Sequence, residues 1–233
     1  MRIVVLVVAV FTGLLMPAQA AQVMIWPSQF SYGTPAGTFT WNSTAIGLRL
    51  DQPIGPFLAL GTTLYYGPIS NFSFAGSSLS GYSGQTLAGD ISLRMGVSAG
   101  PLGLTAYAGY GGFGLNASGP SAPDRVVLSS LGFRTGTEAK VPLAPALSLQ
   151  GSWTFQTGVN SSANISLSSP FTAAQHSGVG SGSEYQLVVV FSPLPRTGFF
   201  AGYRGGSHQN NWSGGGTTTT SYSGPFAGFE IRF

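Results

Sequence analysis

Apolar and polar residues alternate with a period of two over most of the chain. In the segment 86–98, Leu93 and Met95 fall on one parity and Arg94 on the other, and the segment 147–157 repeats this alternation. Such alternation is typical of a β-strand with one apolar and one polar face. No segment beyond the N-terminus has the 3.6-residue apolar period of an amphipathic helix, so the sequence predicts an all-β fold.

Turn signals divide this pattern into hairpins. Short segments that contain Pro alternate along the chain with longer segments that are rich in Ser, Gly, Asn and Thr. Short turns are expected at 51–56, 99–103, 141–145 and 192–197, and long loops at 68–83, 114–124, 159–181 and 209–220. The strands expected between them lie at 22–33, 38–51, 56–67, 84–98, 102–113, 125–141, 146–158, 182–192, 197–208 and 219–233.

The strict alternation of short turns and long loops is typical of a transmembrane, antiparallel, up-and-down β-barrel. An even number of strands places both ends of the chain on the periplasmic side of such a barrel. Pro27 lies inside the first expected strand, and a closed barrel offers no edge at which Pro is easily placed. The prediction is therefore a barrel of ten strands, with a barrel of eight strands as the alternative.

The N-terminal segment has the composition of a secretory signal peptide. Arg2 precedes an uncharged, mostly apolar run at 3–16, which is shorter than the roughly 20 residues of a membrane-spanning helix. An A-x-A cleavage box follows and ends at Ala20. We therefore expect a signal peptide at 1–20, cleaved after Ala20, and one barrel domain at 21–233 that is exported to the bacterial outer membrane.

Charged residues make up 6% of the chain, whereas soluble proteins average about 25%. When the apolar face of each strand is taken as outward, no charge falls in the middle of that face. A charge that faces lipid at mid-membrane costs about 2–4 kcal/mol, which explains the exclusion. Asp51, Asp124, Arg125 and Arg196 are expected at turns or rims. The expected lumen charge network consists of Arg49, Asp90, Arg94, Arg134, Glu138, Lys140, Glu184, Arg204, Glu230 and Arg232.

These cations and carboxylates are expected to pair, because an isolated buried charge is costly. Two interpretations follow, a thin pore that favours anions and a packed, salt-bridged interior that conducts nothing. The remaining interior is expected to hold small or hydroxylic residues such as Gly61 and Thr63. Aromatic residues are expected in belts at the membrane interfaces, namely Tyr65, Tyr66, Phe113, Trp153, Phe155, Tyr185, Phe199, Phe226 and Phe229.

The end of the chain alternates Phe229, Ile231 and Phe233 outward with Glu230 and Arg232 inward. This segment resembles the last-strand signature of bacterial outer-membrane barrels, in which a terminal Phe after alternating apolar residues is read by the barrel-insertion machinery. Ile231 stands where that family often has Tyr. The resemblance implies a small barrel of 8–10 strands, with outer-membrane lipids and the insertion machinery as partners.

His208 is the one candidate for chemistry, because it has inward parity near the long-loop end of the ninth expected strand. The segment around it resembles lipid A 3-O-deacylases, which carry a His-x-Ser-Asn motif with the His as base for the Ser. Asn210 occupies the position of that Ser and cannot accept an acyl group, so the motif is broken. His176 falls in the loop expected at 159–181 and is interpreted as solvated.

Omptin-type proteases are also ten-stranded barrels, and they need paired Asp and Asp-His groups at the rim. Asp51, Asp90 and Asp124 do not supply such a constellation, and no Asp accompanies either His. The chain has no Cys, which excludes thiol catalysis and metal sites with Cys ligands. The sequence thus predicts no catalytic residue, no cofactor and no metal.

The sequence as a whole predicts a non-enzymatic outer-membrane barrel that is structural or forms a narrow pore with a salt-bridged lumen. One alternative is a lipid A-modifying barrel enzyme that uses His208. Another is a secreted soluble β-sandwich or adhesin. The small positive net charge is not clustered, which argues against a nucleic-acid partner. The pattern does not specify an oligomeric state.

Overall fold

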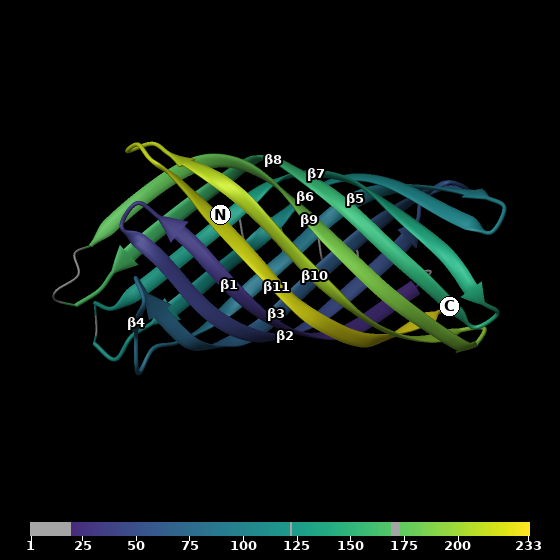
Figure 1. Ribbon diagram of the computed structural model, residues 1–233, viewed down its shortest axis with the longest axis horizontal. Coiled ribbons are helices and arrows are strands. Elements are labelled where there is room, and N and C mark those ends of the chain that lie inside the picture. The colour runs from purple at the N-terminus through teal and green to yellow at the C-terminus, as the bar shows by residue number, and fades with distance from the viewer. Residues whose placement is uncertain (1–19, 122, 169–172) are drawn as a thin grey trace.

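A computed structural model describes residues 20–121, 123–168 and 173–233. The described part is a single antiparallel sheet that closes on itself, because β1 pairs with both β2 and β11 (Figure 1). No helix among the described residues is long and apolar enough to cross a membrane. The strands are β1 (Ala20–Thr34), β2 (Gly37–Pro53), β3 (Leu58–Phe74), β4 (Ser77–Ser78), β5 (Ser83–Ala99), β6 (Leu102–Ser118), β7 (Arg125–Ala144), β8 (Leu147–Ser166), β9 (Ala174–Leu194), β10 (Thr197–Trp212) and β11 (Thr217–Arg232).

The barrel has ten long strands in up-and-down order, and the two-residue β4 adds only a short pairing to the end of β3. The turns that follow β2, β5, β7 and β9 gather at one end of the barrel together with the C-terminus (Figure 1). The longer connections gather at the other end, together with the tight turn between Thr34 of β1 and Gly37 of β2. We call these the short-turn end and the long-loop end. The predicted all-β barrel of ten strands is confirmed, and the eight-stranded alternative is wrong.

The strands run further toward the long-loop end than the sequence analysis predicted. The segment 159–181, which was expected to be a loop, is mostly strand, because β8 continues to Ser166 and β9 begins at Ala174. Likewise β3 continues to Phe74 within the loop expected at 68–83. These segments are rich in Ser, Gly and Asn, and their backbone groups are satisfied by cross-strand pairing all the same.

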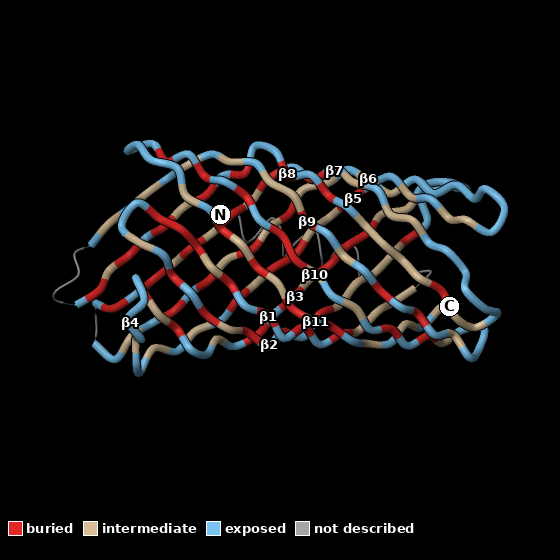
Figure 2. The backbone as a smooth tube through the Cα atoms, in the orientation of Figure 1, coloured by how far each residue is buried: buried red, intermediate tan, exposed pale blue. Residues whose placement is uncertain are grey.

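The outer face of β2 explains why these extensions look like loops in the sequence. Near the short-turn end its outward residues are Leu50, Leu48 and Ile46, and further along they become Thr44 and Asn42. Inward positions are more buried than outward ones from Thr38 to Gly47, and the same alternation is seen around the barrel (Figure 2). The outer wall therefore changes from apolar to polar part of the way along the strand, while the backbone stays extended.

The inner face of β2 changes in the opposite sense. Its inward residues near the short-turn end are Arg49 and Asp51, and toward the long-loop end they are Trp41 and Phe39, which are almost completely buried. Apolar side chains thus face outward in one half of the barrel and face the interior in the other half. A prediction that assigns the apolar face outward along the whole strand therefore does not recognise the strand extensions at the long-loop end.

Two β-bulges lie where the outer wall changes from apolar to polar, and each changes which side chains of its strand face inward. Gly158 in β8 has φ of 58°, and the pairing register shifts between Gln156 and Val159. Asn71 in β3 has φ of 51°, next to a register shift opposite β2. Gly and Asn are the residues that adopt this left-handed conformation most readily. The extra residue at 158 turns Val159 into the interior, where it is 1% exposed.

Pro27 lies within β1, as the sequence predicted, and it pairs with Thr44 of β2. On its other side the β1–β11 pairing stops after Ile25 and resumes at Gln29. A closed barrel therefore accommodates this Pro at the expense of a local gap in one ladder. The predicted signal peptide lies outside the described residues except for Ala20, the first residue of β1.

The outer surface carries a band of exposed apolar side chains around the half of the barrel nearer the short-turn end. A transmembrane barrel needs such a band, about 25 Å tall, to face the hydrocarbon of the bilayer. Members of the band from different strands include Ile25, Ile46, Leu93, Leu104, Phe133, Phe155, Leu187, Phe199 and Phe229, each of which is at least 40% exposed.

Candidate functional site

Arg134 and Glu184 form the centre of a charge network inside the barrel. One Arg134 nitrogen contacts Glu184, and the other lies 3.4 Å from the Asp90 carboxylate. Arg204 reaches the same Glu184 oxygen at 3.1 Å, and Gln156 donates a hydrogen bond to the other oxygen. Arg134 and Glu184 are 7% and 5% exposed, so their mutual pairing compensates charges that have left water.

A second group of charges lies nearer the short-turn end. Arg49 Nη2 is 3.0 Å from Asp51 Oδ2, and Arg94 Nε is 3.6 Å from the other oxygen of that carboxylate. Glu138 accepts a hydrogen bond from Gln150 and lies 3.7 Å from Arg94. Asp51, which the sequence analysis placed at a rim, is therefore a member of the lumen network. Its role was missed because the turn was expected to begin at this residue.

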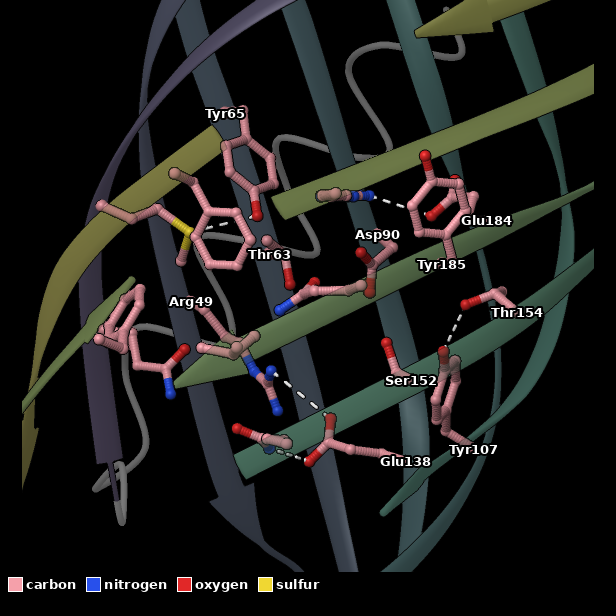
Figure 3. A pocket seen from close by; sticks show the side chains of 18 of the residues that line it. Arg49, Thr63, Tyr65, Asp90, Tyr107, Glu138, Ser152, Thr154, Glu184 and Tyr185 are labelled. Carbon is pink, nitrogen blue, oxygen red and sulfur yellow. Dashed lines mark hydrogen bonds and ion pairs between the residues drawn. The ribbon is translucent and has the colours of Figure 1, made fainter. Parts of the chain in front are cut away.

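The contact between Arg49 and Glu138 spans the interior. Arg49 is on β2 and Glu138 on β7, strands that are four pairings apart by the shorter way around the barrel. Their side chains nevertheless approach to 4.0 Å and meet in the lumen (Figure 3). A cavity of about 60 Å³ lies among the charged side chains. A space of this size holds a few water molecules and no larger solute.

The remaining predicted network residues lie at the mouth of the short-turn end. Glu230 accepts a hydrogen bond from Gln22 at 2.6 Å and pairs with Arg232 on its own strand. Lys140 has inward parity but is exposed, and none of the ion pairs among the described residues includes it. The structure thus brings nine of the ten predicted residues into ion pairs, in separate groups, and leaves Lys140 at the rim.

Arg204 connects the charge network to an aromatic layer that fills the interior beyond it. Its guanidinium lies 5.2 Å from the ring centres of both Trp26 and Tyr65, and 6.0 Å from that of Tyr222. A cation over aromatic faces is stabilised by the ring quadrupoles, more so where water is excluded. These rings come from three different strands, so Arg204 is enclosed on several sides.

The aromatic layer itself occupies the middle of the barrel. Phe30 stacks on Trp41 with ring centres 5.0 Å apart and 3° between the planes. Phe113 and Tyr222 pack against Phe30 from the opposite wall and from β11, at 5.4 and 5.8 Å. We define the aromatic layer as Trp26, Phe30, Tyr32, Trp41, Phe113 and Tyr222, all at most 6% exposed.

This layer corrects the predicted interior and the predicted aromatic belts. The interior was expected to hold small or hydroxylic residues, yet bulky rings occupy it. Tyr65, Phe113 and Phe226 were assigned to the belts and instead face inward, where each is 6% exposed. The other predicted belt residues that face outward are Tyr66, Trp153, Phe155, Tyr185, Phe199 and Phe229.

His208 lies on the inner wall, 3% exposed, in a buried polar chain. Its Nε2 is 3.1 Å from Ser130 Oγ, and Ser130 Oγ is 2.9 Å from Ser161 Oγ. Ser161 donates to Asn210 at 2.7 Å, and Asn210 donates to Thr220 at 3.0 Å. The Ser130 partner was missed because it is 78 residues from His208, and only the barrel brings the strands β7 and β10 within reach.

A Ser hydroxyl beside an imidazole is the arrangement of a nucleophile and its base. Neither His208 nor Ser130 lines the central cavity, and no carboxylate among the described residues forms a hydrogen bond or ion pair with His208. Within the described part, no third, orienting group therefore contacts the imidazole. Within the described ranges, no group of His, Cys, Asp and Glu is arranged to hold a metal ion.

His176 does not lie in a solvated loop, as the sequence analysis expected. It is part of β9 with inward parity and packs edge-on against Trp212, with ring centres 6.1 Å apart. Its buried Nε2 has no hydrogen-bond partner within the described part. His176 thus belongs to the packed interior near the long-loop end, because β9 extends beyond the apolar band.

Asp124 links the connection before β7 to the one after β8 at the long-loop end. Its Oδ1 accepts hydrogen bonds from the backbone N–H and the hydroxyl of Ser168, at 2.6 and 2.7 Å. These hydrogen bonds hold the pKa of the Asp124 carboxyl below its ordinary value. Burial and the nearby Asp124 charge raise the pKa of Tyr82.

The last strand presents its predicted apolar residues to the outside. Phe229, Ile231 and Phe233 are 40%, 41% and 73% exposed, and Glu230 between them points inward. The alternation that carries the resemblance to outer-membrane barrels is therefore present in the structure. Recognition of this strand by an insertion machinery stays a prediction.

Comparison with solved structures shows the same fold in outer-membrane proteins. The outer membrane protease OmpT from Escherichia coli superposes with a TM-score of 0.62 and 11% sequence identity, over 92% of this chain and 96% of that one. The translocator domain of autotransporter NalP from Neisseria meningitidis follows, with a TM-score of 0.44 and 13% identity over 97% and 92% of the two chains. No family model and no curated protein sequence matches this chain. At such low identity the likeness shows the barrel fold alone.

Proposed function

We propose that the protein resides in the bacterial outer membrane as a structural, non-enzymatic barrel that conducts no solutes. The short-turn end then faces the periplasm and the long-loop end faces outward, as in other barrels of this kind. The apolar band spans the hydrocarbon, and the polar half of the wall projects beyond it. Outer-membrane lipids are its immediate partners.

The observation that carries this proposal is the filling of the interior at two successive levels. At the first level Arg49 and Glu138 meet across the lumen, and at the second Phe30 and Trp41 stack within the aromatic layer. A pore needs one continuous aqueous path, and the cavity among the charged side chains measures about 60 Å³. The salt-bridged interior that the sequence left as one of two interpretations is thus favoured over the thin pore.

Single-channel recording in a planar lipid bilayer tests the proposal. The mature barrel is expected to produce no conductance steps, whichever side of the bilayer has the higher salt concentration. A variant with Phe30→Ala and Trp41→Ala in the aromatic layer and Arg49→Ala and Glu138→Ala in the charge network opens both levels and is expected to give small steps. The matched control Trp153→Ala removes an exposed ring from the outer wall and is expected to stay silent. Regular conductance steps from the unmodified barrel would overturn the proposal.

Heat-modifiable migration on a denaturing gel, with membrane fractionation, tests the placement in the membrane. A closed barrel migrates differently before and after boiling, and it stays in the detergent-soluble membrane fraction. A product that is soluble without detergent and shows no migration shift would favour the secreted β-sandwich or adhesin. The fold likeness to a protease does not transfer proteolysis to this chain, because it rests on the backbone alone.

A further inference from the structure

The outer wall beyond the apolar band is almost free of charge. Its outward residues are Ser, Thr, Asn and Gln on strand after strand, as Thr40 and Asn42 on β2 and Gln29 on β1 illustrate. Among the described residues, the one charged side chain with outward parity in this half is Arg125, at the tip of β7. An uncharged surface of hydroxyl and amide groups offers many hydrogen bonds and little attraction for phosphates.

A continuous row of hydroxyls crosses five strands of this wall. Ser183 of β9 pairs with Ser207 of β10, and Ser207 pairs with Ser221 of β11. Ser221 pairs with Ser31 of β1, which in turn pairs with Thr40 of β2. Because neighbouring strands are about 4.8 Å apart, the row extends over roughly 19 Å. We call this the hydroxyl row.

The row forms the floor of a groove. A hollow of about 720 Å³ lies over it, and no residue that lines the hollow is charged. Small side chains keep the floor low, while Gln29 and Asn42 stand beside it. The hydroxyls of Ser31, Ser183, Ser207 and Ser221 take part in none of the hydrogen bonds formed within the described part, so they are available to a ligand.

Two aromatic rings stand at one end of the groove. Trp153 of β8 pairs directly with Tyr185 of β9, and the two are 47% and 45% exposed. A Cβ atom at Gly205 would lie 2.7 Å from the Tyr185 hydroxyl, so the ring lies flat across the neighbouring strand. The C–H face of a sugar ring packs on such an aromatic face, while its hydroxyls both donate and accept hydrogen bonds as Ser, Asn and Gln do.

The groove also borders the apolar band. Leu187 and Val189 follow Tyr185 on the same face of β9, and both are exposed on the lipid-facing wall. Trp and Tyr are enriched at this boundary, where headgroups lie. A molecule that holds its sugars in the groove can therefore place acyl chains along Leu187 and Val189.

We propose that this groove binds the sugar headgroup of a glycolipid of the outer leaflet, through the hydroxyl row and the Trp153–Tyr185 pair. The proposal rests on the placement of the barrel in the outer membrane. Because no cation is among the lining residues, recognition rests on the hydroxyls and C–H faces of the sugars, and phosphates contribute little.

The fluorescence of Trp153 can report whether the groove is occupied. The other Trp residues, Trp26, Trp41 and Trp212, are at most 4% exposed, so a soluble quencher such as acrylamide reports chiefly on Trp153. The full mature barrel is reconstituted into phosphatidylethanolamine vesicles that contain no glycolipid, lipid A alone, or lipopolysaccharide with its core oligosaccharide. We expect protection of Trp153 to rise with the core oligosaccharide and to be small with lipid A or phospholipid.

The variant with Ser207→Leu and Ser221→Leu fills the floor of the groove, and its apparent affinity for core-bearing lipopolysaccharide should fall by roughly tenfold or more. The matched control, Ser83→Leu with Ser118→Leu, changes a directly paired Ser couple on the outer wall of β5 and β6, outside the groove, and should bind as the parent does. Heat-modifiable migration verifies that both variants are folded.

Equal protection of Trp153 by phospholipid, lipid A and lipopolysaccharide would overturn the proposal, and so would unchanged binding by the filled-groove variant. Free core oligosaccharide that binds as tightly as the lipid-anchored form would overturn the assignment to a glycolipid in favour of a soluble glycan. If the protein does not reside in the membrane, this is seen separately, because the heat-dependent migration shift is absent and the protein is not recovered in the membrane fraction.

Discussion

Pro27 of β1 and Pro225 of β11 stand opposite each other in the seam that closes the barrel. Ile25 pairs with Ala227 and Gln29 with Ser223, so the two prolines occupy the middle of the unpaired stretch between these positions. Neither residue has an N–H to donate. The seam therefore lacks hydrogen bonds at one level, although the same register continues on both sides of the gap.

Amide hydrogen exchange should detect this gap. We expect the amides of β1 and β11 that flank the two prolines to exchange faster than those between β10 and β11, whose pairing runs unbroken from Thr197 to Asn211. The variant with Pro27→Val and Pro225→Val restores both donors and should slow exchange at the seam. Mass-resolved exchange in detergent micelles measures both. Uniform protection along the two seams of β11 would contradict the expectation.

Gly224 next to the gap has no room for a side chain. A Cβ atom there would lie 1.9 Å from the Pro27 carbonyl oxygen. Gly224→Ala is expected to destabilise the barrel by about 1–3 kcal/mol, because backbone on both strands must move apart. The control Gly214→Ala places a methyl group where no atom lies within 4 Å and should be neutral. The midpoint of urea unfolding in micelles, followed by the gel shift, compares them.

Removal of Arg134 should be costly because it leaves Asp90 without an ion pair and Glu184 with Arg204 as its one remaining cation among the described residues. Arg134→Met leaves Glu184 and Asp90 without this partner in the interior and is expected to cost about 3–5 kcal/mol of stability. Adding Glu184→Gln to that variant should recover part of the loss, since one buried charge is then removed. Urea unfolding measures both, with Arg196→Met at an exposed turn as the control. A loss no larger than that of the Arg196 variant would show that the lumen pairs are not coupled to folding.

The Ser130–His208 contact is expected to be structural. Ser130→Ala leaves His208 and Ser161 without a shared partner and should destabilise the barrel by about 1–3 kcal/mol. Ser118→Ala on the outer wall serves as the control. Mass analysis of lipid A from cells that express the parent, and from cells that express either variant, should show identical acylation. Acylation that changes with the parent and not with Ser130→Ala would support the lipid A-modifying alternative.

The contact between Asp124 and Ser168 should make the long-loop end sensitive to acid. Because the folded pKa of this carboxyl lies below its ordinary value of 3.8, its stabilising contribution is present above that value and is lost as the pH falls through the folded pKa. Protection of the amides near Ser168, measured relative to their intrinsic exchange rate at each pH, should therefore fall at low pH. Asp124→Asn should show low protection at all pH values, and an acid dependence of protection that survives in Asp124→Asn would assign the effect to another group.

The sequence by itself determined the class of fold and the parity of the charges, and it predicted ten long strands with eight as the alternative. Alternation with period two is a local property, so Leu93, Arg94 and Met95 already show which faces differ in polarity. Exclusion of charge from lipid is strong enough that residues such as Arg134 and Glu184 identify the inner face without coordinates. The alternating Phe229, Ile231 and Phe233 are visible for the same reason.

Only the tertiary structure decided which medium each face meets along the length of a strand. On β2 the apolar side points outward at Ile46 and inward at Trp41, and period two alone does not tell these cases apart. The contact between Arg49 and Glu138 and that between His208 and Ser130 depend on the registers of strands distant in sequence. The closed ladder sets those registers collectively, so the filled interior and the outer groove follow from the barrel as a whole.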